Sequence, residues 1–206
     1  MALSGGTTPG VFFSLIASAA YQGQVDWSRI HFYFTDERGV PPDHPDSNYR
    51  LASELLFCPI GIASEQIHRM KGEMTDLSAA AELYAMELTD LVEEGQPRFD
   101  LVLLGLGPDG HTASLFPNHP ALEERVRWVV KVHDAPKPPP RRLTLTVPIL
   151  QAARQVIFMV SGKDKAPAVR EVLRGTTAPK NCPAKLVEVS TGRVVWLLDE
   201  GAGSLL

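Results

Sequence analysis

Short apolar runs of strand length alternate along this chain with segments of helical periodicity. The runs at 30–34, 99–104 and 156–160 are strand-sized and rich in β-branched and aromatic residues, whereas residues 75–94 place apolar side chains at helical spacing. Such alternation is typical of a parallel sheet covered by helices. It predicts an α/β fold.

Turn and cap signals divide the chain into elements. Thr8 and Pro9 offer an N-cap and a first-turn proline, Gly95 lies where a helix C-cap would, and residues 46–48 can cap a helix near Tyr49. No linker or internal repeat is visible, so a single domain over residues 1–206 is expected. Strands are expected at 1–4, 30–34, 99–104, 128–132, 143–147, 156–160 and 194–198, with helices at 8–22, from about 49, at 75–94 and at 167–174.

Composition excludes several classes of protein. A net charge of -4 with 21% charged residues gives no basic surface for nucleic acid, which favours small-molecule partners. Cys58 and Cys182 are isolated, so neither a disulfide framework nor a zinc motif is indicated, and a reducing cytoplasm is expected. The apolar runs are too short to span a membrane, and no targeting signal is visible. Histidine spacings predict no metal site.

The glycine-rich segment 4–9 is the first candidate site. Gly5 and Gly6 allow a ligand to approach the backbone closely, and the following helix would direct free N–H groups from Thr7 onward at it. A phosphate suits such a position, although an ordinary strand-to-helix turn explains the segment equally well. Asp36 and Arg38 follow the strand at 30–34, either as site residues or as a solvated charged turn.

The segment 105–117 carries the most information. Its glycine spacing imitates a dinucleotide fingerprint, but it comes after about a hundred residues of alternating elements and contains a proline, which argues against NAD. His111 on this turn suits general base catalysis because imidazole titrates near neutral pH, and Asp109 could orient its ring. The alternative is a histidine that bonds a nearby carbonyl.

Two basic segments could supply charge for a phosphate. The proline-rich stretch 136–140 predicts an extended loop that delivers Arg141 and Arg142, and Lys165 lies at a strand-to-helix junction. Arginine offers bidentate pairing and lysine a mobile charge. Taken singly, each of these residues could equally be surface charge.

Taken together, six segments resemble the 6-phosphogluconolactonase family: GGTTP at 5–9, TDER at 35–38, DSNY at 46–49, GLGPDGHTASLFP at 105–117, RRLTLT at 141–146 and GKDK at 162–165. The long segment from Gly105 to Pro117 is specific for this family. The other five segments are weak singly, but they support the resemblance because they occur in this order and spacing. The resemblance spans essentially the whole chain. It implies a doubly wound, mostly parallel sheet with helices on both faces, related to the glucosamine-6-phosphate deaminase fold.

The resemblance also implies an activity and its residues. The activity is hydrolysis of 6-phospho-D-glucono-1,5-lactone in the oxidative pentose phosphate pathway, without metal or cofactor, by a cytoplasmic protein that we expect to be a monomer. His111, flanked by Asp109, would be the catalytic base. The residues expected to bind the 6-phosphate are Gly5, Gly6, Thr7, Arg142 and Lys165, with Asp36 and Arg38 lining the same pocket.

One departure from the family lies at the start of the chain. Relatives carry an N-terminal helix and a fuller first strand, whereas only residues 1–4 precede GGTTP here. We therefore expect this chain to lack that helix and one sheet face to lose part of its cover.

Three alternatives are weighed against this interpretation. A glucosamine-6-phosphate deaminase would carry a glutamate where Phe116 stands, and phenylalanine cannot transfer a proton. A non-catalytic sugar-phosphate sensor would not need the intact Asp109 and His111 pair. An inactive, truncated product of an enzyme gene is the third alternative.

Overall fold

The computed structural model describes residues 1–189 and 192–206. In this part of the chain the main sheet has five parallel strands in the order β10-β9-β6-β1-β2. The chain adds β2 on one side of β1 and then builds the remaining strands on the other side, so the sheet is doubly wound. The strands are β1 (Ala2–Leu3), β2 (Tyr33–Phe34), β6 (Val102–Leu104), β9 (Gln155–Val160) and β10 (Arg193–Leu198).

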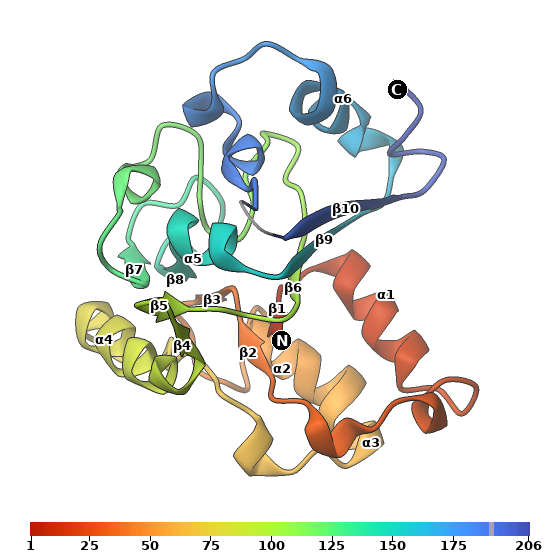
Figure 1. Cartoon of the computed structure of the whole chain (residues 1–206), viewed down its shortest axis with the longest axis vertical. Helices are drawn as coiled ribbons and strands as arrows, with labels where there is room; N and C mark the ends of the chain where they lie inside the picture. The colour runs from red at the N-terminus through yellow and green to blue at the C-terminus, as the bar shows by residue number, and fades with distance from the viewer. Residues whose placement is uncertain (190–191) are drawn as a thin grey trace.

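Helices cover both faces of this sheet, which confirms the expected α/β fold. Helix α1 (Thr7–Ile16) lies on one side and α6 (Ala166–Arg174) on the other (Figure 1). Helix α2 (Asn48–Ala52) continues through a π-helical turn into α3 (Cys58–Ile60) on the side of α1. The remaining helices are α4 (Leu77–Glu87) and α5 (Val147–Ala152), and single 3₁₀ turns lie at Gln22–Gln24, Trp27–Arg29, Ser64–Gln66, Thr89–Leu91, Pro120–Glu123, Lys163–Lys165, Pro179–Asn181 and Pro183–Leu186.

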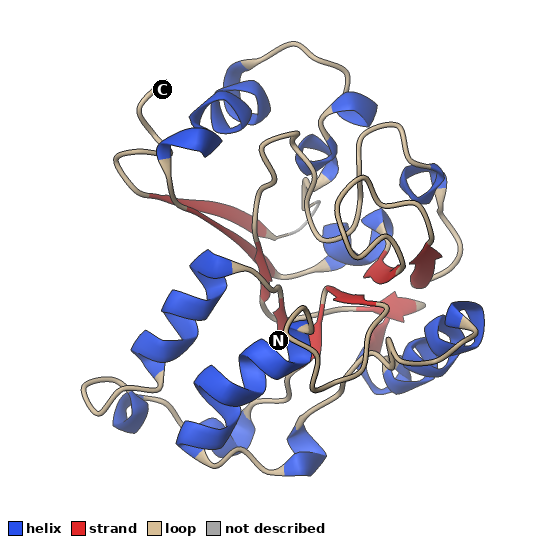
Figure 2. Ribbon diagram, turned by 180° about the vertical axis from the view of Figure 1, so that it is seen from behind, coloured by secondary structure: helices blue, strands red, loops and turns tan. Residues whose placement is uncertain are grey.

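A second sheet was not expected. Strands β3 (Asp36–Arg38), β8 (Arg142–Leu145) and β7 (Val129–Val132) pair antiparallel in the order β3-β8-β7, and α4 packs against them (Figure 2). The strands predicted at 128–132 and 143–147 therefore exist, but they lie outside the parallel sheet. Residues 36–38, for which the sequence offered either site residues or a charged turn after a strand, form a strand of their own.

The helix predicted over 75–94 is wrong beyond Glu87. Asp76 caps α4 by accepting hydrogen bonds from the N–H groups of Ser78 and Ala79, but the helix ends at Glu87. A hairpin of β4 (Val92–Glu93) and β5 (Gln96–Pro97) follows. Gly95, expected to cap the helix, has a φ of 89° in the hairpin turn. A left-handed glycine serves either purpose, so the sequence signal was ambiguous.

Helix α1 also differs at both ends from the prediction of 8–22. It begins at Thr7, with Gly6 rather than Thr8 at the N-cap position and no side-chain cap. It ends at Ile16, after which the Ser18 hydroxyl donates to the carbonyl of Leu15. Serine side chains that bond to the backbone in this way compete with helix continuation.

Tyr84 closes the free edge of the main sheet. Its side chain comes from α4 and is 2% exposed, and its hydroxyl accepts from Phe34 N–H at 2.7 Å and donates to Phe34 C=O at 3.2 Å. One phenol thus satisfies both backbone groups of an edge residue that would otherwise be buried without partners.

We predict that Tyr84→Phe destabilises the protein by about 1–3 kcal/mol, because it leaves the buried N–H and C=O of Phe34 unpaired. Urea unfolding measures the change. Tyr21→Phe is the matched control, since Tyr21 is 45% exposed and its replacement should change stability by less than about 0.5 kcal/mol. Equal effects of the two substitutions would contradict this role for Tyr84.

Candidate active site

The strand order reverses beside β1, and the sequence-predicted segments gather there. Residues 4–7 follow β1, and the segment 105–117 follows the neighbouring strand β6. In open α/β sheets, ligands bind outside the carboxyl ends of the strands at the point where the order reverses. The topology therefore places both segments at the expected ligand site.

The loop between β1 and α1 lies between two cavities. Gly6 has a φ of 106°, and the N–H groups of the first helical turn follow it. On one side a cavity of about 400 Å³ is lined by Gly5, Gly6, Thr7 and Lys165. On the other side a cavity of about 460 Å³ is lined by Gly6, Thr7 and Arg38. Lys165 and Arg38 thus line two different cavities, and both cavities share Gly6 and Thr7.

Gly5 is required by the packing of Asn48. A Cβ atom at position 5 would lie 1.7 Å from Asn48 Oδ1. The Asn48 side chain is itself fixed, since its Nδ2 donates to the Asp36 carbonyl at 2.8 Å. Glycine therefore lets the loop after β1 pack closely against Asn48 of α2, which in turn bonds to β3.

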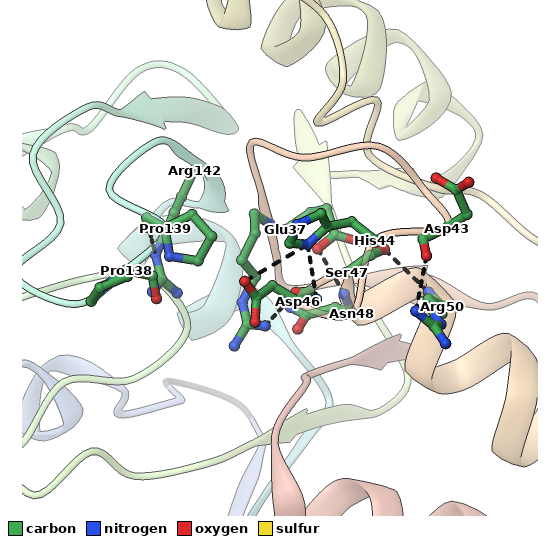
Figure 3. A network of polar contacts seen from close by, with 11 residues as sticks. Glu37, Asp43, His44, Asp46, Ser47, Asn48, Arg50, Pro138, Pro139 and Arg142 are labelled. Atoms are coloured by element: carbon green, nitrogen blue, oxygen red, sulfur yellow. Dashed lines mark hydrogen bonds and ion pairs between the residues drawn. The ribbon is translucent and has the colours of Figure 1, made fainter.

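Glu37 ties β3 to the start of α2. Its buried carboxylate accepts hydrogen bonds from the N–H groups of Asn48 and Tyr49 and from the Ser47 hydroxyl (Figure 3). Burial raises the pKa of Glu37, and these hydrogen bonds oppose the rise. Ser47 also accepts from Arg50 N–H, so it caps α2 as the sequence suggested.

Asp36 links β3 to the histidine-bearing segment. Its Oδ2 accepts from the Ser114 hydroxyl at 2.7 Å, and its side chain is buried. Ser114 N–H in turn donates to Thr144 Oγ1 of β8 at 3.3 Å. Asp36 therefore connects β3 to the segment 105–117 through this hydrogen bond.

Arg142 organises the proline-rich loop rather than lining either cavity among the described residues. Its Nε donates to the Pro139 carbonyl, and its Nη2 donates to those of Lys137 and Pro138 (Figure 3). Burial lowers the pKa of Arg142, and the nearby Asp36 opposes that change. Arg38 pairs with Arg142 across the two strands. The expected contact of Arg142 with a phosphate stays a prediction.

His111 is held by a tight turn after β6. Gly107 N–H donates to the His111 carbonyl at 2.8 Å, and the imidazole Nδ1 bonds directly to Asp109 Oδ1. Burial raises the pKa of Asp109, but the hydrogen bond and charge of His111, with the charge of Lys137, outweigh it and lower this pKa from 3.8 to about 2. Asp109 is therefore a carboxylate at neutral pH, with the opposite Nε2 edge of the ring directed away from it.

Close backbone packing fixes this turn from both sides. A Cβ atom at Gly107 would lie 1.9 Å from His111 Nδ1, and one at Gly110 would lie 2.6 Å from Cys182 Sγ. Ala184 N–H also donates to the Gly110 carbonyl at 3.0 Å. Gly107 and Gly110 therefore allow close packing around the turn that holds the histidine.

The comparisons with known proteins identify the family. The model of the glucosamine-6-phosphate isomerases/6-phosphogluconolactonase family matches residues 1–196. The chain belongs to this family.

Its relatives include several 6-phosphogluconolactonases. Human 6-phosphogluconolactonase is 42% identical over 208 residues, which cover all of this chain and 80% of the human protein. The solved structure of 6-phosphogluconolactonase from Trypanosoma brucei is 30% identical, with a TM-score of 0.86 over 98% of this chain and 84% of that one. A monomeric glucosamine-6-phosphate deaminase aligns with a TM-score of 0.81 over all of this chain and 87% of its own, but at 24% identity it shows the fold alone.

Within this family fold, sequence reasoning missed several contacts of the site. Asn48, Glu37 and Ser114 were not proposed as structural partners of the site, although all three lie in or beside motifs. Lys137 Nζ lies 3.9 Å from Asp109 Oδ1, which the proline-rich stretch gave no reason to expect. For Asn48, Glu37 and Ser114 the signal was a buried polar residue within or beside a motif, and burial is visible only in the fold.

Residues 1–189 and 192–206 contain no group of three or more histidine, cysteine, aspartate or glutamate side chains placed to hold a metal ion. Nor does any helix in this part of the chain have the length and apolar character that crossing a membrane requires. Monomeric state and cytoplasmic location stay predictions.

We predict that Gly5→Ala destabilises the protein by about 1–3 kcal/mol, because the added methyl group must displace the Asn48 amide. Thermal unfolding measures this change. Gly23→Ala is the matched control, since an added Cβ there meets nothing within 4 Å. A loss of stability no larger than that of the control would show that the Gly5–Asn48 contact is easily relaxed.

Proposed function

We propose that this chain hydrolyses 6-phospho-D-glucono-1,5-lactone to 6-phospho-D-gluconate in the oxidative pentose phosphate pathway, with His111 as the general base. Family membership supports the reaction. The role of His111 rests on one observation, its bond to the Asp109 carboxylate. The turn that holds this pair follows β6, which pairs with β1, so it lies beside the loop that follows β1. No cofactor is needed, since the reaction only adds water across an ester bond.

His111 begins the reaction by activating water. The Asp109 carboxylate accepts a hydrogen bond from Nδ1–H and so keeps the proton on that nitrogen. The lone pair on Nε2 is then free to deprotonate a water molecule as it attacks C1 of the lactone. The resulting imidazolium then protonates the ring oxygen as its bond to C1 breaks. A base placed in this way contributes typically about 10²–10⁴-fold to the rate.

The distal phosphate positions the lactone for this attack. The N–H groups that begin at Thr7 and the Lys165 ammonium supply its positive surroundings, and Arg142 is our remaining candidate contact. Gly5 and Gly6 keep the backbone accessible. Anchoring the phosphate holds the lactone in place at the site and so raises kcat/KM.

Two kinds of donor are available for the oxyanion that develops at C1. One is a backbone N–H group of the glycine-rich segments, and the other is Arg38, which lines the cavity adjoining the phosphate loop. Asp36 then belongs to the frame of the pocket, because its carboxylate is occupied by Ser114. The acidic group that a deaminase would need at position 116 is replaced by a buried phenyl ring.

We predict that His111→Ala lowers kcat by about 10²–10⁴-fold, whereas Lys165→Ala raises KM about tenfold or more and largely preserves kcat. The assay uses fresh lactone with the spontaneous rate subtracted, because lactones open unaided. Thermal unfolding of both variants controls for folding. The reverse pattern would overturn these roles, and a wild-type rate at background would favour a sugar-phosphate sensor.

A further inference from the structure

Phe116 contacts two groups of the site that can each carry a positive charge. Its ring centroid lies 4.6 Å from that of His111, with an angle of 37° between the planes. The Arg142 guanidinium carbon lies over the same ring, 5.5 Å from the centroid. Phe116 is 1% exposed, so these contacts are made away from bulk water.

We propose that Phe116 is a positioning residue that fixes the His111 imidazole and stabilises its protonated form during catalysis. The proposal rests on the proposed role of His111 as base. It assigns to Phe116 a role that acts through the histidine.

The backbone gives Phe116 a fixed position. Leu115 N–H donates to the Thr112 carbonyl at 2.9 Å, and His119 N–H donates to the carbonyl of Phe116 at 3.1 Å. Asn118, in a left-handed conformation with a φ of 57°, donates its N–H to the Lys180 carbonyl. The ring is therefore held against His111 by a backbone that is bonded on both sides.

The charges around His111 explain why an aromatic ring is useful there. Asp109 bonds the ring directly, Lys137 faces Asp109, Arg142 lies over Phe116, and Cys182 packs under the turn at Gly110. When His111 takes a proton from water, a second cation forms near the permanent charge of Arg142. The negative face of an aromatic ring attracts both cations, whereas an aliphatic side chain would fill the space without this attraction.

The substitution pair that tests the proposal is Phe116→Leu and Phe116→Tyr. Leucine keeps an apolar side chain but removes the ring, and tyrosine keeps the ring. Phe99→Leu is the matched control, because Phe99 is also 1% exposed but precedes β6, at the end of the strand opposite to His111. All three variants are expected to lose stability, so stability alone does not decide the question.

Two readouts separate positioning from packing. In Phe116→Leu we expect kcat to fall about three- to tenfold with KM within about twofold of wild type, and the NMR titration of the His111 ring to move about half a pH unit or more to lower pH. Phe116→Tyr and Phe99→Leu should keep the wild-type titration. The acid side of the pH–rate profile should move in the same direction as the NMR signal.

An unchanged or raised titration midpoint in Phe116→Leu would overturn the proposal, as would an equal shift in Phe99→Leu. Failure of the proposed function is a separate result. It would appear as wild-type hydrolysis at the spontaneous rate or as full activity of His111→Ala. The NMR titration still measures the effect of Phe116 on the imidazole in either case.

Discussion

The site depends on the backbone of one residue, Thr35, which joins the two sheets. Its N–H donates to the Leu3 carbonyl of β1 at 2.8 Å, and its carbonyl accepts from Leu145 N–H of β8 at 2.7 Å. Its buried hydroxyl also donates to the Leu3 carbonyl at 3.2 Å. Through this residue the chain leaves the parallel sheet and enters the antiparallel one. The strand that carries Asp36 and Arg38 is thereby placed beside the loop that follows β1.

The joining of the two sheets brings together parts that are far apart in sequence. The glycine-rich loop comes from the end of β1, the histidine turn from the end of β6, and the proline-rich loop precedes β8. Asp36 bonds to Ser114 across 78 positions of the chain, so the two sheets are also connected beneath the histidine. The candidate site is thus assembled from short segments on a rigid frame, an arrangement common among sites of α/β proteins.

Much of this frame could be predicted from the sequence because apolar runs and glycine-rich turns report local structure. They identified the strands of the main sheet, helix α6 and the segments at the carboxyl ends of β1 and β6. They failed at residues 36–38 and 89–97, where the outcome depends on a partner strand or on a glycine that suits two kinds of turn. The contacts of Asn48, Arg142 and Phe116 could not be predicted, because each depends on burial and on residues brought close only by the fold.

The central claim is that one site holds a distal phosphate and opens a lactone ring. It is tested most directly by comparing wild-type hydrolysis of 6-phosphoglucono-δ-lactone with that of glucono-δ-lactone, each corrected for its spontaneous rate. We predict that kcat/KM falls by at least about a hundredfold without the phosphate, because anchoring energy is then lost from the transition state. Equal values of kcat/KM for the two lactones would contradict it.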